Sequence, residues 1–303
     1  MTQGRRLLFW LLVVATNFHG ESVPVIQKVV TEVDVNLVAT DSRGRFVPGL
    51  TAEDVKVIDQ GLPVPYFAMR QSTGLPLQLG IVLDLSESTR RNWTQSQTAI
   101  NEFIRNLARP EDEIFLVAFD DHVRLEKSLL PEKGLEFSLP LPSQGGQTAL
   151  YDAICHASQK KLFELPTGTR RSALLVFSDG VDNTSWHSQD DAVRSAQARS
   201  ISIYTITSRR PRQDQSGDEV LRQLACSTGG QDFVVNRDGE MRNVLSLVDD
   251  ELRNYYLLYF HPSGQGGTNG EFRRLRLIPV RNDSLSFRYR AGYFVPGMQK
   301  AEP

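Results

Sequence analysis

The sequence predicts an α/β protein in which a doubly wound, mostly parallel sheet is inserted in a small all-β sandwich. Short apolar strands alternate with segments of helical periodicity over 77–254, the pattern of βαβ crossovers. Extended patterns without helices precede this block at 23–76 and follow it at 255–297. Neither flank is large enough for a core of its own, so we expect the two to pair in one sandwich. The alternative is two small separate sheets that pack on the α/β block.

A secretory signal peptide is predicted over residues 1–22. Arg5 and Arg6 precede a wholly apolar run, Leu7–Ala15, and polar residues follow. The run is shorter than the roughly 20 apolar residues that span a bilayer, which favours a cleaved signal over an uncleaved anchor. No second long apolar segment occurs. We therefore expect an exported protein, periplasmic or secreted, with no transmembrane helix in the mature chain.

The flanking segments alternate apolar and polar residues. In the first flank, 30–40 alternates with a period close to two, and 54–70 contains a strand, a glycine-containing turn and another strand. In the second flank we expect strands at 255–262, 272–280 and 285–296, followed by a tail at 298–303.

The central block contains the helices. Apolar residues recur at helical spacing on one face of each segment, as at Ile100, Phe103 and Ile104, or at Met241 and Leu245. The predicted strands are 77–85, 112–120, 122–129, 171–180, 201–208 and 231–236. The predicted helices are 91–108, 148–165, 188–200, 218–230 and 239–256.

Composition excludes several classes of function. The formal net charge of −2 provides no broad basic field, so nucleic acid is not an expected partner. The five histidines form no close pair with metal-ligand spacing, which disfavours zinc. Cys155 and Cys226 either pair in an oxidising compartment or remain two separate thiols, and spacing does not decide between these. The sequence leaves the oligomeric state open.

Acidic and hydroxyl side chains follow three of the predicted strands. Asp84, Ser86 and Ser88 end the first apolar strand, Thr148 precedes a helix, and Asp179 ends another buried strand. In an open parallel sheet such strand ends meet at one edge, where ligands bind. All five side chains offer oxygen, which suits a hard cation such as Mg²⁺, with Mn²⁺ and Ca²⁺ as alternatives. Two carboxylates leave that cation partly neutralised and open to a carboxylate from another molecule.

Other interpretations of these residues remain open at this point. Taken alone, the serines could cap a helix. A phosphotransferase motif beginning at Asp84 would need a second acidic residue at position 86, where the sequence has Ser86. The negative charge of Asp152 is expected to stabilise the N-terminus of its helix rather than to bind metal. Asp182 is expected to shape its loop. Glu87 is expected at the rim of the site, pointing away from Ser86 and Ser88.

These motifs resemble a known site. D-L-S-E-S at 84–88, Thr148 after Gly145–Gly146, and S-D-G at 178–180 are similar to the metal-ion-dependent adhesion site of von Willebrand factor type A domains. The resemblance implies that fold over Leu77–Asn254. It also implies a divalent cation held by Asp84, Ser86, Ser88, Thr148 and Asp179 and completed by a partner's acidic side chain. The flanks resemble the VWFA-related proteins abundant in Acidobacteria.

The expected function is therefore binding rather than catalysis. The first hypothesis is an exported adhesion module that captures an acidic group of a protein partner through the cation. The second is a structural component of an envelope assembly, in which the cation only stabilises the fold. A metal-assisted hydrolase is the weakest hypothesis, because no nucleophile or general base stands near the five residues.

Overall fold

The structure is a computed structural model in which all the described residues belong to one compact unit. The predicted signal peptide at 1–22 and the predicted tail at 298–303 lie outside the described residues. No helix in the described part of the chain is long and apolar enough to cross a membrane. The described residues are 32–130, 147–160, 169–208, 217–236, 240–262 and 270–295.

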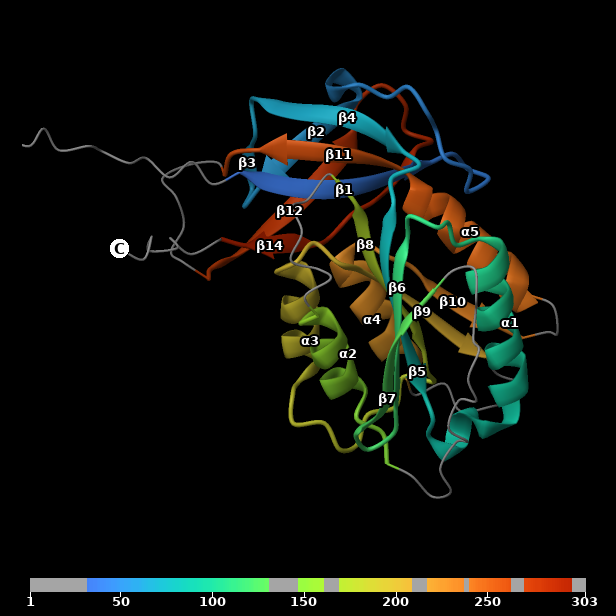
Figure 1. Cartoon of the computed structure of the whole chain (residues 1–303). Coiled ribbons are helices and arrows are strands. Elements are labelled where there is room, and N and C mark those ends of the chain that lie inside the picture. The colour runs from blue at the N-terminus through green and yellow to red at the C-terminus, as the bar shows by residue number, and fades with distance from the viewer. Residues whose placement is uncertain are drawn as a thin grey trace, which may run out of the picture. The chain divides into compact units, whose positions relative to one another are not determined.

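A six-stranded sheet forms the α/β part of the chain (Figure 1). The order is β10-β9-β8-β5-β6-β7, and every neighbouring pair is parallel except β6 with β7. All eight residues of β5 are buried, as a continuous apolar strand in a covered sheet requires. The strands are β5 (Leu77–Asp84), β6 (Glu113–Phe119), β7 (Val123–Leu129), β8 (Arg171–Phe177), β9 (Ser202–Ser208) and β10 (Asp232–Val235).

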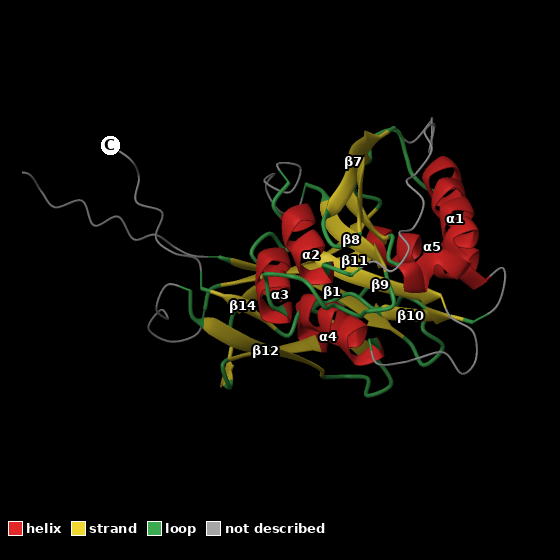
Figure 2. Cartoon of the chain, turned by 90° about the horizontal axis from the view of Figure 1, so that it is seen from below, coloured by secondary structure: helices red, strands yellow, loops and turns green. Residues whose placement is uncertain are grey.

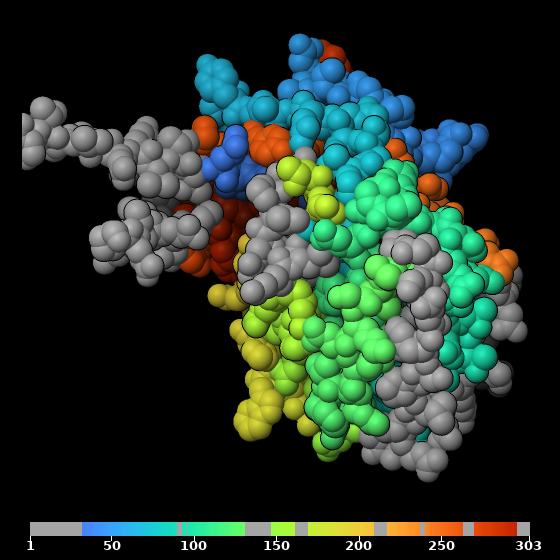
Figure 3. Space-filling view, viewed as in Figure 1, coloured from blue at the N-terminus to red at the C-terminus, as the bar shows by residue number. Residues whose placement is uncertain are grey.

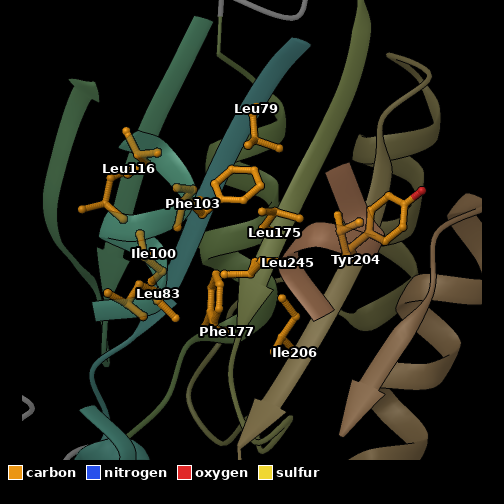
Figure 4. Close-up of a cluster of buried hydrophobic side chains, with 14 of the residues drawn as sticks. Leu79, Leu83, Ile100, Phe103, Leu116, Leu175, Phe177, Tyr204, Ile206 and Leu245 are labelled. Atoms are coloured by element: carbon orange, nitrogen blue, oxygen red, sulfur yellow. The ribbon is translucent and has the colours of Figure 1, made fainter. Parts of the chain in front are cut away.

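Helices cover both faces of this sheet, which confirms the predicted fold class. One face carries α1 (Trp93–Asn106) and α5 (Glu240–Arg253), and the other carries α2 (Leu150–Ser158), α3 (Gln189–Gln197) and α4 (Asp218–Thr228) (Figure 2). On the first face, Ile100, Phe103 and Leu245 of the helices pack against the strand side chains that are also labelled in Figure 4. A 3₁₀ helix, η2 (Glu87–Asn92), leads from β5 into α1.

Gly80 lies where β5 has no room for a side chain. A Cβ atom there would be 2.4 Å from Cδ2 of Leu174 and 2.6 Å from Cζ of Phe115. Both neighbours are buried, so neither can move without disturbing the core. We expect Gly80→Ala to lower the free energy of unfolding by about 1–3 kcal/mol, measured by urea denaturation. Unchanged stability would show that this part of the core can repack.

The two flanks share one β-sandwich. The first sheet has the order β13-β1-β11-β4 and the second has β14-β12-β2-β3, so each contains strands from both ends of the chain. β1 pairs antiparallel with β11, and β2 pairs antiparallel with β12. A common apolar core lies between the sheets. The strands are β1 (Val33–Thr40), β2 (Val55–Asp59), β3 (Leu62–Pro63), β4 (Phe67–Thr73), β11 (Asn254–Phe260), β12 (Phe272–Pro279), β13 (Ser286–Arg288) and β14 (Gly292–Phe294). One 3₁₀ turn, η1 (Ala52–Asp54), precedes β2.

Several predicted boundaries were wrong. The helix predicted at 148–165 ends at Ser158, where Gln159 caps it. The last helix ends at Arg253 and not at 256, because Asn254 already pairs with β4 in the sandwich. The predicted strand at 285–296 is two strands, β13 and β14. Its first part pairs with β1 and its second with β12, so this one segment serves both sheets.

The two cysteines do not form a disulfide. Cys155 is buried on α2, whereas Cys226 is exposed on α4. Burial raises the pKa of the Cys155 thiol to about 12, so this side chain stays protonated and unreactive. Of the two alternatives that the spacing left open, the structure has two separate thiols.

Candidate metal centre

The predicted site lies at the carboxyl ends of the parallel strands, marked by their arrowheads in Figure 1. Asp84 is the last residue of β5, and Asp179 follows the end of β8, the strand beside it. Ser86 lies in the bend after β5, and Ser88 lies in the first turn of η2. Thr148 stands two residues before α2 and is buried.

Asp84 is a carboxylate held in the protein interior. Only 1% of the residue is exposed. Its Oδ1 accepts a hydrogen bond from the Ser86 backbone N–H at 2.8 Å, and its Oδ2 accepts one from the Ser178 hydroxyl at 2.6 Å. Burial, together with a smaller effect of the nearby Asp179, raises the pKa of Asp84 to about 6 against the effect of these hydrogen bonds. Such a carboxylate favours a compensating positive charge.

The two serines of the turn come together. The Ser86 and Ser88 hydroxyl oxygens are 3.0 Å apart. The Thr89 hydroxyl donates to the backbone carbonyls of Asp84 and Ser86, each at 2.9 Å, and so fixes the turn that carries them. Ser88, Asp84 and Asp179 line one cavity together with Ser178. Strand, turn and loop therefore present hydroxyl and carboxylate oxygens to a common space.

Thr148 is joined to the loop that carries Asp179. Its backbone N–H donates to Oδ1 of Asn183 at 2.8 Å, and the Asn183 N–H donates back to the Thr148 carbonyl at 3.0 Å. The next N–H, that of Ala149, donates to the Asp120 carbonyl at 2.7 Å at the end of β6. Two neighbouring loops thus fix the position of Thr148.

The Asn183 contact leads to a prediction about affinity. We expect Asn183→Ala to weaken divalent-cation binding about 10-fold, because partners that orient metal ligands typically contribute a factor of 10–100. Isothermal titration with Mg²⁺ or Mn²⁺ measures this change. Asp190→Asn, a change at an exposed acid on α3, serves as the control. Equal affinities for both variants and the wild type would show that Thr148 needs no such support.

Gly180 lets the chain turn sharply after Asp179. Its φ is +82°, and a Cβ atom there would lie 2.3 Å from the Gly217 carbonyl oxygen. The Gly180 N–H donates to the Ser178 hydroxyl, the same hydroxyl that donates to Asp84. The S-D-G sequence is therefore required by backbone geometry as well as by the acid that it carries.

The neighbouring acids have structural roles. Asp152 accepts the backbone N–H groups of Trp186 and His187 at 3.0 and 2.9 Å, and the His187 ring nitrogen lies 2.7 Å away. Asp182 accepts the N–H of Tyr151 in the first turn of α2. As expected, Asp182 shapes its loop. Asp152 ties the segment at Trp186 and His187 to α2. Its position in the sequence did not indicate this contact.

The donor set fits a hard divalent cation. All five predicted residues offer oxygen, and the two acids lie close enough for each charge to disfavour the other. Sequence reasoning did not assign the Ser178 hydroxyl or the Asn183 amide. Ser178 lies inside the quoted S-D-G motif, whereas no local signal marks Asn183.

Comparisons with known proteins agree with the domain identified from these motifs. The family model for the von Willebrand factor type A domain matches residues 79–181, which confirms the resemblance over that segment. No curated protein matches the sequence at a significant level. The resemblance of the flanks to bacterial proteins stays a prediction.

Several solved structures are similar in fold. Proximal thread matrix protein 1 from the mussel byssus, with a zinc-occupied MIDAS motif, aligns at 16% identity over 60% of this chain and 49% of that chain, with a TM-score of 0.46. The aligned region is thus about half the length of the mussel protein. Manganese-loaded TRAP protein from Plasmodium vivax aligns at 13% identity over 75% and 98%, with a TM-score of 0.44. A von Willebrand factor type A protein from Catenulispora acidiphila aligns at 12% over 90% and 76%, with a TM-score of 0.47.

Proposed function

Because the family model of the von Willebrand factor type A domain matches residues 79–181, we propose that this chain is an exported adhesion module that binds an acidic group of a protein partner through a divalent cation. We propose Asp84, Ser86, Ser88, Thr148 and Asp179 as the residues that hold the cation, and Mg²⁺ as the cation. Mn²⁺ and Ca²⁺ are the alternatives. One observation carries the proposal: a buried carboxylate, Asp84, lies beside a second acid in a cavity lined by hydroxyl, carboxylate and apolar side chains.

The residues around Asp84 suit a binding role. Ser178 and the Ser86 N–H fix both oxygens of the Asp84 carboxylate, so this ligand is oriented before any cation arrives. The other proposed ligands, apart from Asp179, are neutral hydroxyls. Asp84 and Asp179 formally balance the charge of a divalent cation, but five protein oxygens leave a position in an octahedral shell that a partner's carboxylate could fill.

Adhesion is favoured over hydrolysis by the contents of the cavity. The described residues that line it include no histidine, cysteine or lysine. The acids that line it, Asp84 and Asp179, could act as general bases, but both are proposed here to bind the cation. The proposed role is therefore capture rather than turnover.

A capture experiment tests the proposal. The wild type, Asp84→Ala and the control Asp190→Asn are immobilised and exposed to native envelope extract, with Mg²⁺ or with a chelator. We expect a protein partner to bind the wild type and the control in Mg²⁺ and to be lost with the chelator or with Asp84→Ala. Capture that survives the chelator, with stability lowered, would support the structural role of the metal instead. Metal-dependent hydrolysis that requires Asp179 would support the enzyme.

A further inference from the structure

A second cluster of metal-binding side chains lies in the turn between β6 and β7. Asp120, Asp121 and His122 each offer one ligand atom, and these atoms all lie within 4.8 Å of one another. The turn is closed by a hydrogen bond from the Asp120 N–H to the His122 carbonyl at 3.0 Å. None of the three residues belongs to the site proposed above.

Asp120 has a buried oxygen without a hydrogen bond. The residue is only 2% exposed, and its Oδ2 accepts a hydrogen bond from Arg124 at 2.5 Å. Its Oδ1 has no hydrogen-bond partner among the described residues. A buried carboxylate oxygen without a partner is costly, which points to a ligand at this position. Nδ1 of His122 lies 3.6 Å from this oxygen.

His122 faces two carboxylates through the same nitrogen. Its Nδ1 lies 2.5 Å from Oδ1 of Asp121, in addition to its approach to Asp120. Arg124 supplies one positive charge against these two acids.

We propose that Asp120, Asp121 and His122 bind a transition-metal dication of the Zn²⁺ type. An imidazole nitrogen combined with two carboxylates favours Zn²⁺, Mn²⁺ or Co²⁺, whereas Mg²⁺ prefers oxygen alone. Three protein ligands leave a further position for water or for a partner's donor group.

The geometry requires only small movements. Metal–ligand bonds of about 2.0–2.2 Å place neighbouring ligand atoms roughly 3–3.5 Å apart. The present separations from His122 Nδ1, 3.6 Å to Asp120 and 2.5 Å to Asp121, lie on either side of that range. The side chains of Asp121 and His122 are 54% and 66% exposed and can adjust, while Arg124 holds Asp120 in place.

This cluster is linked to the first site through the backbone. The Asp120 carbonyl accepts the N–H of Ala149, next to Thr148, and the Phe119 carbonyl accepts the N–H of Leu85, next to Asp84. In the space-filling view, the green surface around β7 adjoins the yellow-green surface of α2 (Figure 3). A metal bound at the turn would therefore stiffen a segment that supports Thr148.

Titration of the full chain with Co²⁺ tests the proposal, because Co²⁺ reports nitrogen ligation and low coordination by its visible absorption. Excess Mg²⁺ is included to fill an oxygen-only site. We expect wild type and Asp84→Ala to bind one Co²⁺ under these conditions. His122→Ala and Asp121→Asn should weaken this binding more than about 100-fold, since they remove ligands rather than supporting contacts. Zn²⁺ should displace the Co²⁺ signal.

His156→Ala is the matched control, because His156 is a comparably exposed histidine that pairs with Glu126 outside the cluster. This variant should bind Co²⁺ as the wild type does. Both cluster variants change exposed side chains, so circular dichroism should show that they fold. The proposal fails if His122→Ala and Asp121→Asn bind Co²⁺ like the wild type, or if Asp84→Ala alone abolishes binding. Retained Co²⁺ binding in Asp84→Ala leaves the adhesion proposal to its own test.

Discussion

Replacing Arg253 by methionine should lower the free energy of unfolding by about 3–5 kcal/mol, because it leaves the carboxylate of Asp112 buried without its counter-ion. Arg253 ends α5, and its guanidinium lies 2.6 Å from Oδ2 of Asp112 and 3.1 Å from Oδ1 of Asp249. Side-chain exposure is 4% for Arg253 and 1% for Asp112. Burial alone would lower the pKa of Arg253, but Asp112 and Asp249 raise it overall, so the arginine remains charged.

The position of this ion pair explains the size of the expected effect. Asp112 also accepts the backbone N–H groups of Leu77, at the start of β5, and of Arg109. Arg253 immediately precedes β11 of the sandwich. The pair therefore joins the start of the parallel sheet to the junction of helix and sandwich. Urea denaturation measures the loss of stability.

A second arginine on the same helix provides the control. Arg242 pairs with Glu102 through two hydrogen bonds, but its side chain is 73% exposed. Exposed ion pairs are screened by water, so Arg242→Met should change stability little. The double variant Arg253→Met with Asp112→Asn should be more stable than Arg253→Met alone, since it removes the unpaired charge. Equal effects of the two single changes would contradict this account of the junction.

The fold could be predicted because its strongest signals are local. Continuous apolar strands such as β5 and the apolar stripe of α5 follow directly from hydrophobic periodicity. The errors occur where periodicity does not decide. At Asn254 a helical stripe runs directly into a strand, and only pairing with β4 sets the boundary. The break between β13 and β14 depends on two different partner strands, which the sequence of that segment does not encode.

The residues of the candidate site also fall into two groups: those that local sequence signals predict and those that only the folded structure reveals. Asp84 and Asp179 could be placed at one edge because both end neighbouring buried strands. Asn183 could not, because its role depends on a contact with Thr148, 35 residues away. His122 lacks a histidine partner in the sequence, so a search for metal-binding pairs overlooks it. Its neighbours are carboxylates, and the burial of Asp120 becomes visible only in the folded chain.

Asp84→Asn should stabilise the metal-free protein at pH 7 by about 3 kcal/mol. Burial raises the pKa of Asp84 from 3.8 to about 6, and each tenfold change in proton affinity corresponds to about 1.4 kcal/mol. The folded protein thus binds this proton more tightly than the unfolded chain does. The stabilisation of the folded state by protonation of Asp84 is complete below about pH 4 and is lost as the pH rises through about 6. An amide avoids the buried charge and can still accept the Ser86 N–H.

The pH dependence separates this effect from those of other groups. In chelator, the difference in unfolding free energy between Asp84→Asn and the wild type should be smallest near pH 4 and grow until about pH 7. Added Mg²⁺ at 100 times its dissociation constant should stabilise the wild type by about 2.7 kcal/mol and the variant not at all. Cation affinity should fall as the pH drops through about 6, because the proton and the metal compete for Asp84. If Asp84→Asn is less stable than the wild type in chelator at pH 7, the protein itself already stabilises the ionised Asp84 carboxylate. The burial of Asp84 would then not favour the binding of a cation.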